Sequence, residues 1–124
     1  MTLLLFLPVV AGVLLHTYTM VFVAEGGMSG FLVGVFLWSC LPYAVASLLP
    51  SIQVKPGIPA GFAFGTLFGD LFMHYSAFIS PKGSTAALGL LFMPLWNLAL
   101  LGPLGALVAW AVLRIVGCNG RNAA

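Results

Sequence analysis

Three polar side chains recur every four residues in an otherwise apolar part of the chain: Thr66, Asp70 and His74. On an α-helix this spacing places them on one face and brings the carboxyl group of Asp70 within reach of the imidazole of His74. A carboxylate near the centre of a bilayer costs at least about 2.5 kcal/mol unless it is paired. We therefore expect either a proton-responsive or ligand-contacting pair that faces the protein interior, or a hydrogen-bonded pair that only fixes the rotation of its helix.

The two histidines of the sequence, His16 and His74, lie equally far into the first and third apolar segments. If these two segments run in the same direction, the two imidazoles lie at similar depth. Two facing imidazoles can ligate a b-type haem or the magnesium of a chlorophyll. The alternative is that each histidine donates a hydrogen bond to a neighbouring carbonyl group, with no cofactor bound.

No set of residues in the sequence has the pattern of a catalytic site. Glu25 is the only acid besides Asp70, and it falls at the end of an apolar segment. There is no catalytic triad, no HExxH zinc motif and no C-x-x-C pair, so we expect no metal site and no enzyme. The formal net charge of +2 comes without a basic cluster, so nucleic acid is not an expected partner.

Glycines recur every four residues in two places, in the pattern called a glycine zipper. The two ladders are Gly26, Gly30 and Gly34, followed by Gly61, Gly65 and Gly69. Such ladders let two helix backbones approach closely in lipid, where burial of apolar surface gives no drive for association. The simpler prediction is that they pack the second and third helices against each other. The alternative is that one ladder faces another protein.

The composition indicates that lipid surrounds the elements that position these residues. Of the 124 residues, 62% are hydrophobic and 5% are charged, and the mean hydropathy is +1.18. A soluble domain carries charges on about 25% of its residues. A surface with so few charges does not stay dissolved in water, so we expect an integral membrane protein.

Four apolar segments predict four membrane crossings, at about residues 2–24, 28–49, 60–79 and 85–116. About 20 residues of α-helix cross a hydrocarbon core of about 30 Å. Residues 50–59 hold three prolines and a lysine, which predict a loop rather than a continuous helix. The expected fold is an all-α membrane protein, an antiparallel four-helix bundle that forms one transmembrane domain over residues 1–124.

The last segment is too long for one upright crossing. Pro94 and the pair Gly102-Pro103 lie inside it. We expect a tilted helix that is kinked at proline. The alternative is a short re-entrant or interfacial piece over residues 85–93, followed by a crossing helix.

The basic residues predict the orientation in the membrane. With four crossings, Lys55, Arg114 and Arg121 lie on the same side as both termini, whereas Lys82 lies on the other side with Glu25. Loops rich in lysine and arginine stay in the cytoplasm. Both termini are therefore expected to be cytoplasmic.

Residues 84–98 (STAALGLLFMPLWNL) and 102–105 (GPLG) carry a resemblance to known proteins. A turn of Ser, Thr and small residues leads into a leucine–phenylalanine run, which ends in proline, leucine, an aromatic residue and a polar residue. This pattern resembles the last segment of small bacterial inner-membrane proteins that are described only as hypothetical. The resemblance implies a multi-pass protein of the bacterial cytoplasmic membrane and implies no defined activity.

Three functions are compatible with these features. The small size, the packing ladders and the lack of a reaction centre favour a non-catalytic accessory or scaffold subunit of a larger membrane complex. The polar stripe favours a small oligomeric transporter or channel that uses Asp70 and His74. The paired histidines favour a haem- or pigment-binding protein that uses His16 and His74. Besides the lipid bilayer, the expected partners are other membrane subunits or further copies of the chain.

Overall fold

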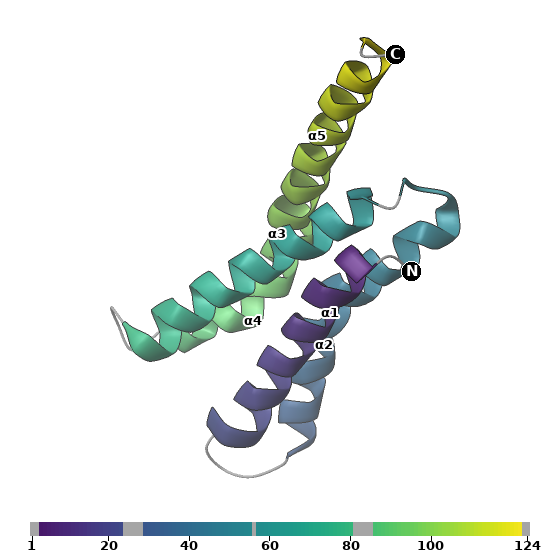
Figure 1. Ribbon diagram of the computed structural model, residues 1–124. Coiled ribbons are helices and arrows are strands. Elements are labelled where there is room, and N and C mark those ends of the chain that lie inside the picture. The colour runs from purple at the N-terminus through teal and green to yellow at the C-terminus, as the bar shows by residue number, and fades with distance from the viewer. Residues whose placement is uncertain (1–2, 24–28, 56, 81–85, 123–124) are drawn as a thin grey trace.

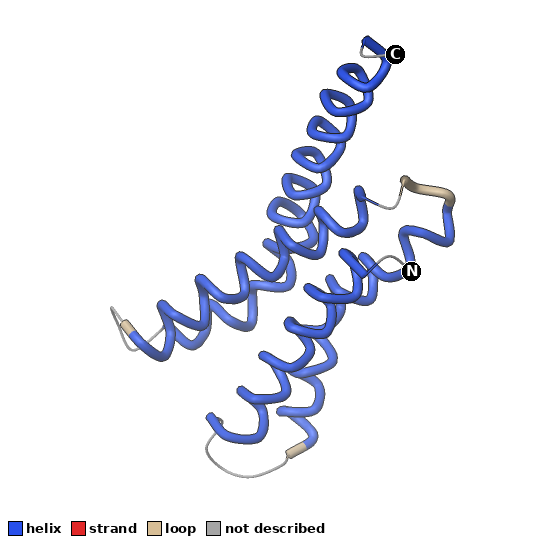
Figure 2. Tube along the Cα trace, in the orientation of Figure 1, coloured by secondary structure: helices blue, strands red, loops and turns tan. Residues whose placement is uncertain are grey.

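The computed structural model describes residues 3–23, 29–55, 57–80 and 86–122, and nearly all of them are helical (Figure 1, Figure 2). Within these ranges there is no strand. The expected all-helical class is therefore confirmed.

The described residues form four long helical segments, three of which contain a five-residue stretch of π-helix. In chain order the parts are α1 (Leu3–Tyr18) and the π-helical η1 (Thr19–Val23); α2 (Gly30–Leu48) and the 3-10 turn η2 (Leu49–Ile52); α3 (Gly57–His74) and the π-helical η3 (Tyr75–Ile79); and α4 (Ala86–Trp96), the π-helical η4 (Asn97–Leu101) and α5 (Gly102–Asn122). Consecutive segments run in opposite directions along the molecule (Figure 1).

The connection between α2 and α3 is shorter than the ten-residue loop that its prolines predict. Pro50 falls in the first positions of η2, and Pro59 falls in the first turn of α3. A proline is tolerated there because the first N–H groups of a helix have no partner inside the helix. The chain turns at Gln53, which has a φ of 60° in the left-handed region and ends η2.

The helices that contain an internal proline continue through it. Pro8 lies inside α1, Pro42 inside α2 and Pro94 inside α4, and all three are fully buried. In a membrane protein the carbonyl groups freed by a proline can be satisfied by neighbouring helices and side chains. These prolines therefore interrupt hydrogen bonding on the packed face without ending the helix.

The fourth segment is helical from Ala86 to Asn122, and residue 85 lies outside the described residues. Its first part, α4, packs against both α2 and α3, while α5 packs mainly against α3. In Figure 1 α4 and α5 point in different directions, and the π-helical η4 lies between them. Residues 86–93 are thus the first turns of a long helix.

Three of the segments are long and apolar enough to cross a membrane: Leu3–Val23, Gly30–Ile52 and Leu88–Gly117. The remaining segment, α3 with η3, has a similar length but carries the polar stripe. It contacts α1, α2, α4 and α5, and α3 buries more residues than α1 or α2. The helix that carries the polar stripe is therefore the one that the others cover.

The glycine ladder of α3 packs against α5, so the expectation that it packs against the second helix is wrong. A Cβ atom added at Gly61 or Gly65 would overlap backbone atoms of the fourth segment, at Gly105 and Leu101. A Cβ atom at Gly105 would in turn overlap the carbonyl oxygen of Gly61. Each helix thus presents small residues to the other, and the two backbones touch. Gly69 continues the same contact, toward side chains of α4 and η4.

The other glycine ladder makes no contact within the described chain. An added Cβ atom at Gly30 or Gly34 would have no neighbouring atom within 4 Å. Gly26 lies outside the described residues. The close approach of α2 to α1 comes instead at Gly12, where an added Cβ atom would overlap the ring of Tyr43.

Candidate functional site

A single buried carboxylate joins all four helical segments. Asp70 on α3 is 2% exposed and lies at hydrogen-bond distance from three donor groups. The hydroxyl of Tyr43 on α2 donates to Oδ2 at 2.7 Å, and Nδ2 of Asn97 in η4 donates to Oδ1 at 2.7 Å. Nε2 of His16 on α1 lies 3.0 Å from Oδ2, within hydrogen-bond distance. Each of the other three segments therefore supplies one partner to Asp70.

His74 contacts Asp70 in a different way from the one expected. Its Nδ1 lies 2.8 Å from the backbone carbonyl oxygen of Asp70, and its Nε2 lies 2.9 Å from Oγ1 of Thr19 on the neighbouring η1. The expected pairing of the His74 ring with the Asp70 carboxylate is thus wrong, because the i,i+4 geometry brings the ring onto the carbonyl group instead. The carboxylate turns toward α1 and is paired with His16.

The two histidines meet, as their similar depth suggests, but they do not fit a haem or a chlorophyll. Their ring centroids are 5.5 Å apart and the rings are tilted by 57°. The cavity beside them has a volume of about 80 Å³, whereas sites for larger organic ligands have about 300–1,000 Å³. Nε2 of His16 already contacts Asp70 and Nε2 of His74 already contacts Thr19, so neither atom is free to ligate a metal. Within the described residues, no group of three or more His, Cys, Asp and Glu side chains is arranged to hold a metal ion.

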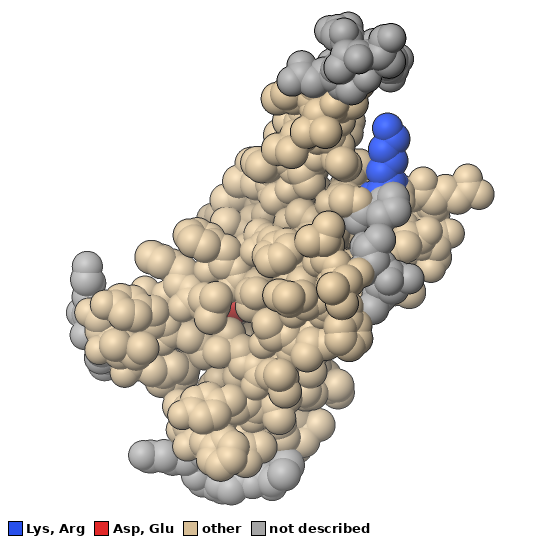
Figure 3. All heavy atoms as spheres, in the orientation of Figure 1, with Lys and Arg blue, Asp and Glu red and all other residues tan. Residues whose placement is uncertain are grey.

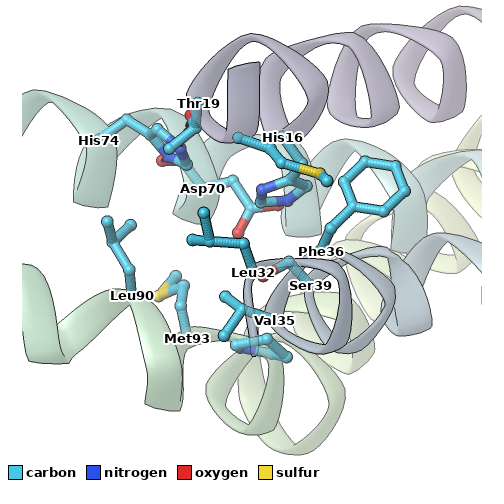
Figure 4. A pocket seen from close by; sticks show the side chains of 12 residues that line it. His16, Thr19, Leu32, Val35, Phe36, Ser39, Asp70, His74, Leu90 and Met93 are labelled. Atoms are coloured by element: carbon cyan, nitrogen blue, oxygen red, sulfur yellow. Dashed lines mark hydrogen bonds and ion pairs between the residues drawn. The ribbon is translucent and has the colours of Figure 1, made fainter. Parts of the chain in front are cut away.

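The cavity is partly polar and lies against the hydrogen-bonded cluster (Figure 4). Its polar lining comes from His16, Thr19, Ser39, Asp70 and His74, and the rest of the lining is apolar. A space of this volume with several polar partners can hold a few water molecules. The cluster is therefore placed where it can exchange protons with confined water.

Thr66, the first residue of the polar stripe, does not join the cluster. It is fully buried, and its Oγ1 has no hydrogen-bond partner among the described residues. The same holds for Oδ1 of Asn97, whose amide nitrogen binds Asp70. The stripe therefore divides into a network around Asp70 and His74 and a separate buried hydroxyl one turn away.

Tyr43 reaches Asp70 because α1 has no side chain where the two helices cross. The space above Gly12 is filled by the ring of Tyr43, whose edge faces the ring of His16 at a centroid distance of 6.1 Å. The phenol therefore lies between α1 and α2 with its hydroxyl on Asp70. Gly12 is a positioning residue for this donor.

The three π-helical stretches all begin at the cluster. Thr19 is the first residue of η1, Asn97 is the first residue of η4, and η3 begins directly after His74. A π-helical turn inserts an extra residue into the helix and changes the direction of the side chains that follow, and such turns occur frequently at functional sites. Three of the segments thus depart from regular α-helix at the depth of Asp70.

The sequence contains a signal for this cluster that helical periodicity does not reveal. Four residues of the cluster follow one another at intervals of 27 residues: His16, Tyr43, Asp70 and Asn97. One membrane crossing of about 20 residues plus a short connection has about this length. Residues at this spacing near the middle of each crossing lie at a common depth, even though the direction alternates. Tyr43 and the pairing of His16 with Asp70 were missed for this reason.

No family model, curated protein or solved structure matches the chain.

Replacing Tyr43 with phenylalanine removes one donor from Asp70 and leaves the ring in place. We expect the Tyr43→Phe variant to lose about 1–2 kcal/mol of unfolding free energy, because a hydrogen bond to a buried carboxylate is lost. Unfolding in detergent micelles measures the change. The matched control is Tyr75→Phe, at an exposed tyrosine, for which we expect less than about 0.5 kcal/mol. Equal effects in the two variants would show that Tyr43 does not stabilise Asp70.

Proposed function

We propose that the chain is a small, non-catalytic membrane transporter or channel, in which protonation of the cluster around Asp70 controls the passage of protons or another small ion. The observation that supports it is the Asp70 carboxylate, which is held by donors from three other segments beside a partly polar cavity. Ionisable side chains inside membrane segments are costly and commonly belong to ion pathways or proton relays. An apolar residue at position 70 would pack the four helices without this cost.

We further propose that the chain crosses the membrane four times as an antiparallel bundle with a Pro-kinked last helix. Three apolar segments support this arrangement, and the fourth, α3, is covered by the other helices. The described atoms on the face shown in Figure 3 are almost all uncharged, apart from one small blue protrusion at the upper right and a small red area near the middle. Lys55 and Arg114 are both exposed. By the positive-inside rule, we propose that both termini face the cytoplasm and that the membrane is a bacterial inner membrane. Lys82 and Glu25, on which the expectation for the other side rests, lie outside the described residues.

The proposed path requires more than one copy of the chain or a change of conformation. The cavity of about 80 Å³ accommodates only a few water molecules, and most of its lining is apolar. Four helices in contact enclose little room. We therefore propose a homo-oligomer, in which the cavity opens toward a path between protomers.

The first test is proton flux in proteoliposomes that contain the purified chain and an entrapped pH-sensitive dye. We expect a pH-dependent flux that is abolished in the Asp70→Asn variant, because an amide in place of the carboxylate removes the acid that holds His16 and Tyr43 and so disrupts the cluster beside the cavity. Circular dichroism must show that the variant keeps its helical content. The control is Lys55→Gln, which alters an exposed charge outside the cluster and should leave the flux unchanged. A flux that is the same in native protein and Asp70→Asn contradicts the proposal.

The second candidate function is a non-catalytic accessory subunit of a larger membrane complex, and a different observation favours it. Gly30 and Gly34 form a smooth face of α2 that contacts nothing in the described chain. Along α5 most large apolar side chains are exposed; they include Leu104, Leu107, Val108, Val112, Ile115 and Val116. A small-residue face of this kind allows another transmembrane helix to approach closely.

This candidate predicts that the native protein co-purifies with larger subunits at fixed stoichiometry in mild detergent. The Gly34→Leu variant should release them, because the new side chain fills the contact face while nothing within the chain opposes it. Mass spectrometry of native and variant preparations measures the loss. The matched control is Val33→Leu, at an exposed apolar position beside the ladder. A homo-oligomer without other subunits would contradict the accessory role and agree with the transport proposal.

A further inference from the structure

The two histidines of the cluster differ in their hydrogen bonds. A backbone carbonyl oxygen can only accept, so the contact between Nδ1 of His74 and the carbonyl oxygen of Asp70 requires a proton on Nδ1. In the neutral ring Nε2 is then a bare acceptor, and it faces the hydroxyl of Thr19 at 2.9 Å. The tautomer of neutral His74 is thus fixed by the backbone of α3.

The hydroxyl of Thr19 has two partners but only one hydrogen. Its Oγ1 lies 3.0 Å from the carbonyl oxygen of Leu15 and 2.9 Å from Nε2 of His74. When His74 is neutral, the hydroxyl donates to Nε2. When His74 is protonated, Nε2 donates to Oγ1 and the hydroxyl donates to Leu15 instead. Both protonation states are fully hydrogen-bonded with the same heavy-atom positions, and they differ by one rotation of a hydroxyl group.

His16 cannot change its protonation at Nε2 in this way and keep its hydrogen bond. Its Nε2 faces Oδ2 of Asp70, which also accepts from Tyr43, and removal of the proton from this contact would set two acceptors against each other. The other titratable groups around the cluster are Tyr43 and Cys40 on α2, together with Tyr18 and Tyr75, which line the groove beside His74. The described residues of α4 and η4 carry none. The pair of His16 and Asp70 is therefore the fixed part of the cluster.

His74 and Thr19 also lie between two cavities of the protein. Both residues line the cavity, and both line a second, more open groove between the ends of the first and third segments. The rest of that groove is lined by apolar and aromatic side chains, among them Tyr18, Tyr75 and Phe78. The side chain of His74 is therefore close to both the cavity and the groove, whereas Asp70 lines the cavity alone.

We propose that His74 is the proton-exchanging group of the cluster and that Thr19 is a positioning residue whose hydroxyl rotates as the proton enters or leaves. His74 takes the proton at Nε2, between the cavity and the groove, while the contact between His16 and Asp70 keeps its own proton. This inference deepens the proposed function, because it names the residue through which protonation would act.

Solid-state NMR of the full chain in lipid bilayers, with nitrogen-15 in the histidine rings, tests this directly. The chain has two histidines, and the His74→Asn variant identifies which signals belong to His74. As the pH rises, we expect His74 to change from the doubly protonated ring to a ring with its proton on Nδ1 and a bare Nε2. A neutral His74 with its proton on Nε2 would overturn the inference.

The role of Thr19 is tested in the same measurement with two substitutions. Thr19→Val keeps the shape of the side chain but removes the hydroxyl, so we expect His74 to bind its proton about tenfold more weakly. Thr19→Ser should restore the native value. The matched control is Thr17→Val, because Thr17 also donates to its own helix, at Val13, but is exposed and does not contact His74. An unchanged proton affinity in Thr19→Val would remove Thr19 from the mechanism.

The outcome also separates this inference from the transport proposal. If His74 titrates as described but proteoliposomes show no pH-dependent flux, the exchange site is correct and the transport function is wrong. If flux depends on Asp70 while His74 keeps one protonation state throughout, transport stands and the assignment to His74 is overturned.

Discussion

The arrangement of the helices depends on the need to satisfy one carboxylate away from water. Asp70 lies on the most covered helix and is almost completely buried. In lipid a polar group of this kind has to find its partners within the protein. The chain meets this need with a phenol, an amide and an imidazole from the other three segments, and each of them fixes the depth and rotation of its helix relative to α3. Displacing any of these helices along its axis would leave a buried donor or acceptor without a partner.

Small residues make these contacts geometrically accessible. Gly61 and Gly65 allow α3 and α5 to touch along their backbones, which brings the adjoining η4 and its Asn97 against Asp70. Gly12 does the same between α1 and α2 by leaving room for the ring of Tyr43. In a bilayer the association of helices depends on such packing and on hydrogen bonds between them, since apolar burial contributes little. The glycines and the polar cluster therefore act together.

The helical class could be predicted from the sequence because charge depletion and long apolar runs are properties of the chain itself. The partners of particular residues could not. The i,i+4 rule places His74 beside Asp70 correctly but does not say whether its ring meets the carboxylate or the carbonyl oxygen. The glycine ladder of α3 shows that a close helix contact exists, yet nothing in its spacing distinguishes α2 from α5 as the partner. The 27-residue spacing that connects His16, Tyr43, Asp70 and Asn97 has meaning only once the segments are placed antiparallel.

The Asp70 carboxyl group has His16, rather than His74, as its imidazole partner. Asp70 is the only aspartate in the sequence, so carbon-13 in the aspartate side-chain carboxyl and nitrogen-15 in the histidine rings label this contact without ambiguity. Dipolar recoupling NMR in lipid bilayers then measures the distance between the carboxyl carbon and each ring nitrogen. The structure predicts a strong coupling to Nε2 of His16 that disappears in the His16→Asn variant. A coupling that persists in His16→Asn and disappears in His74→Asn, or no strong coupling to either ring, would contradict the account.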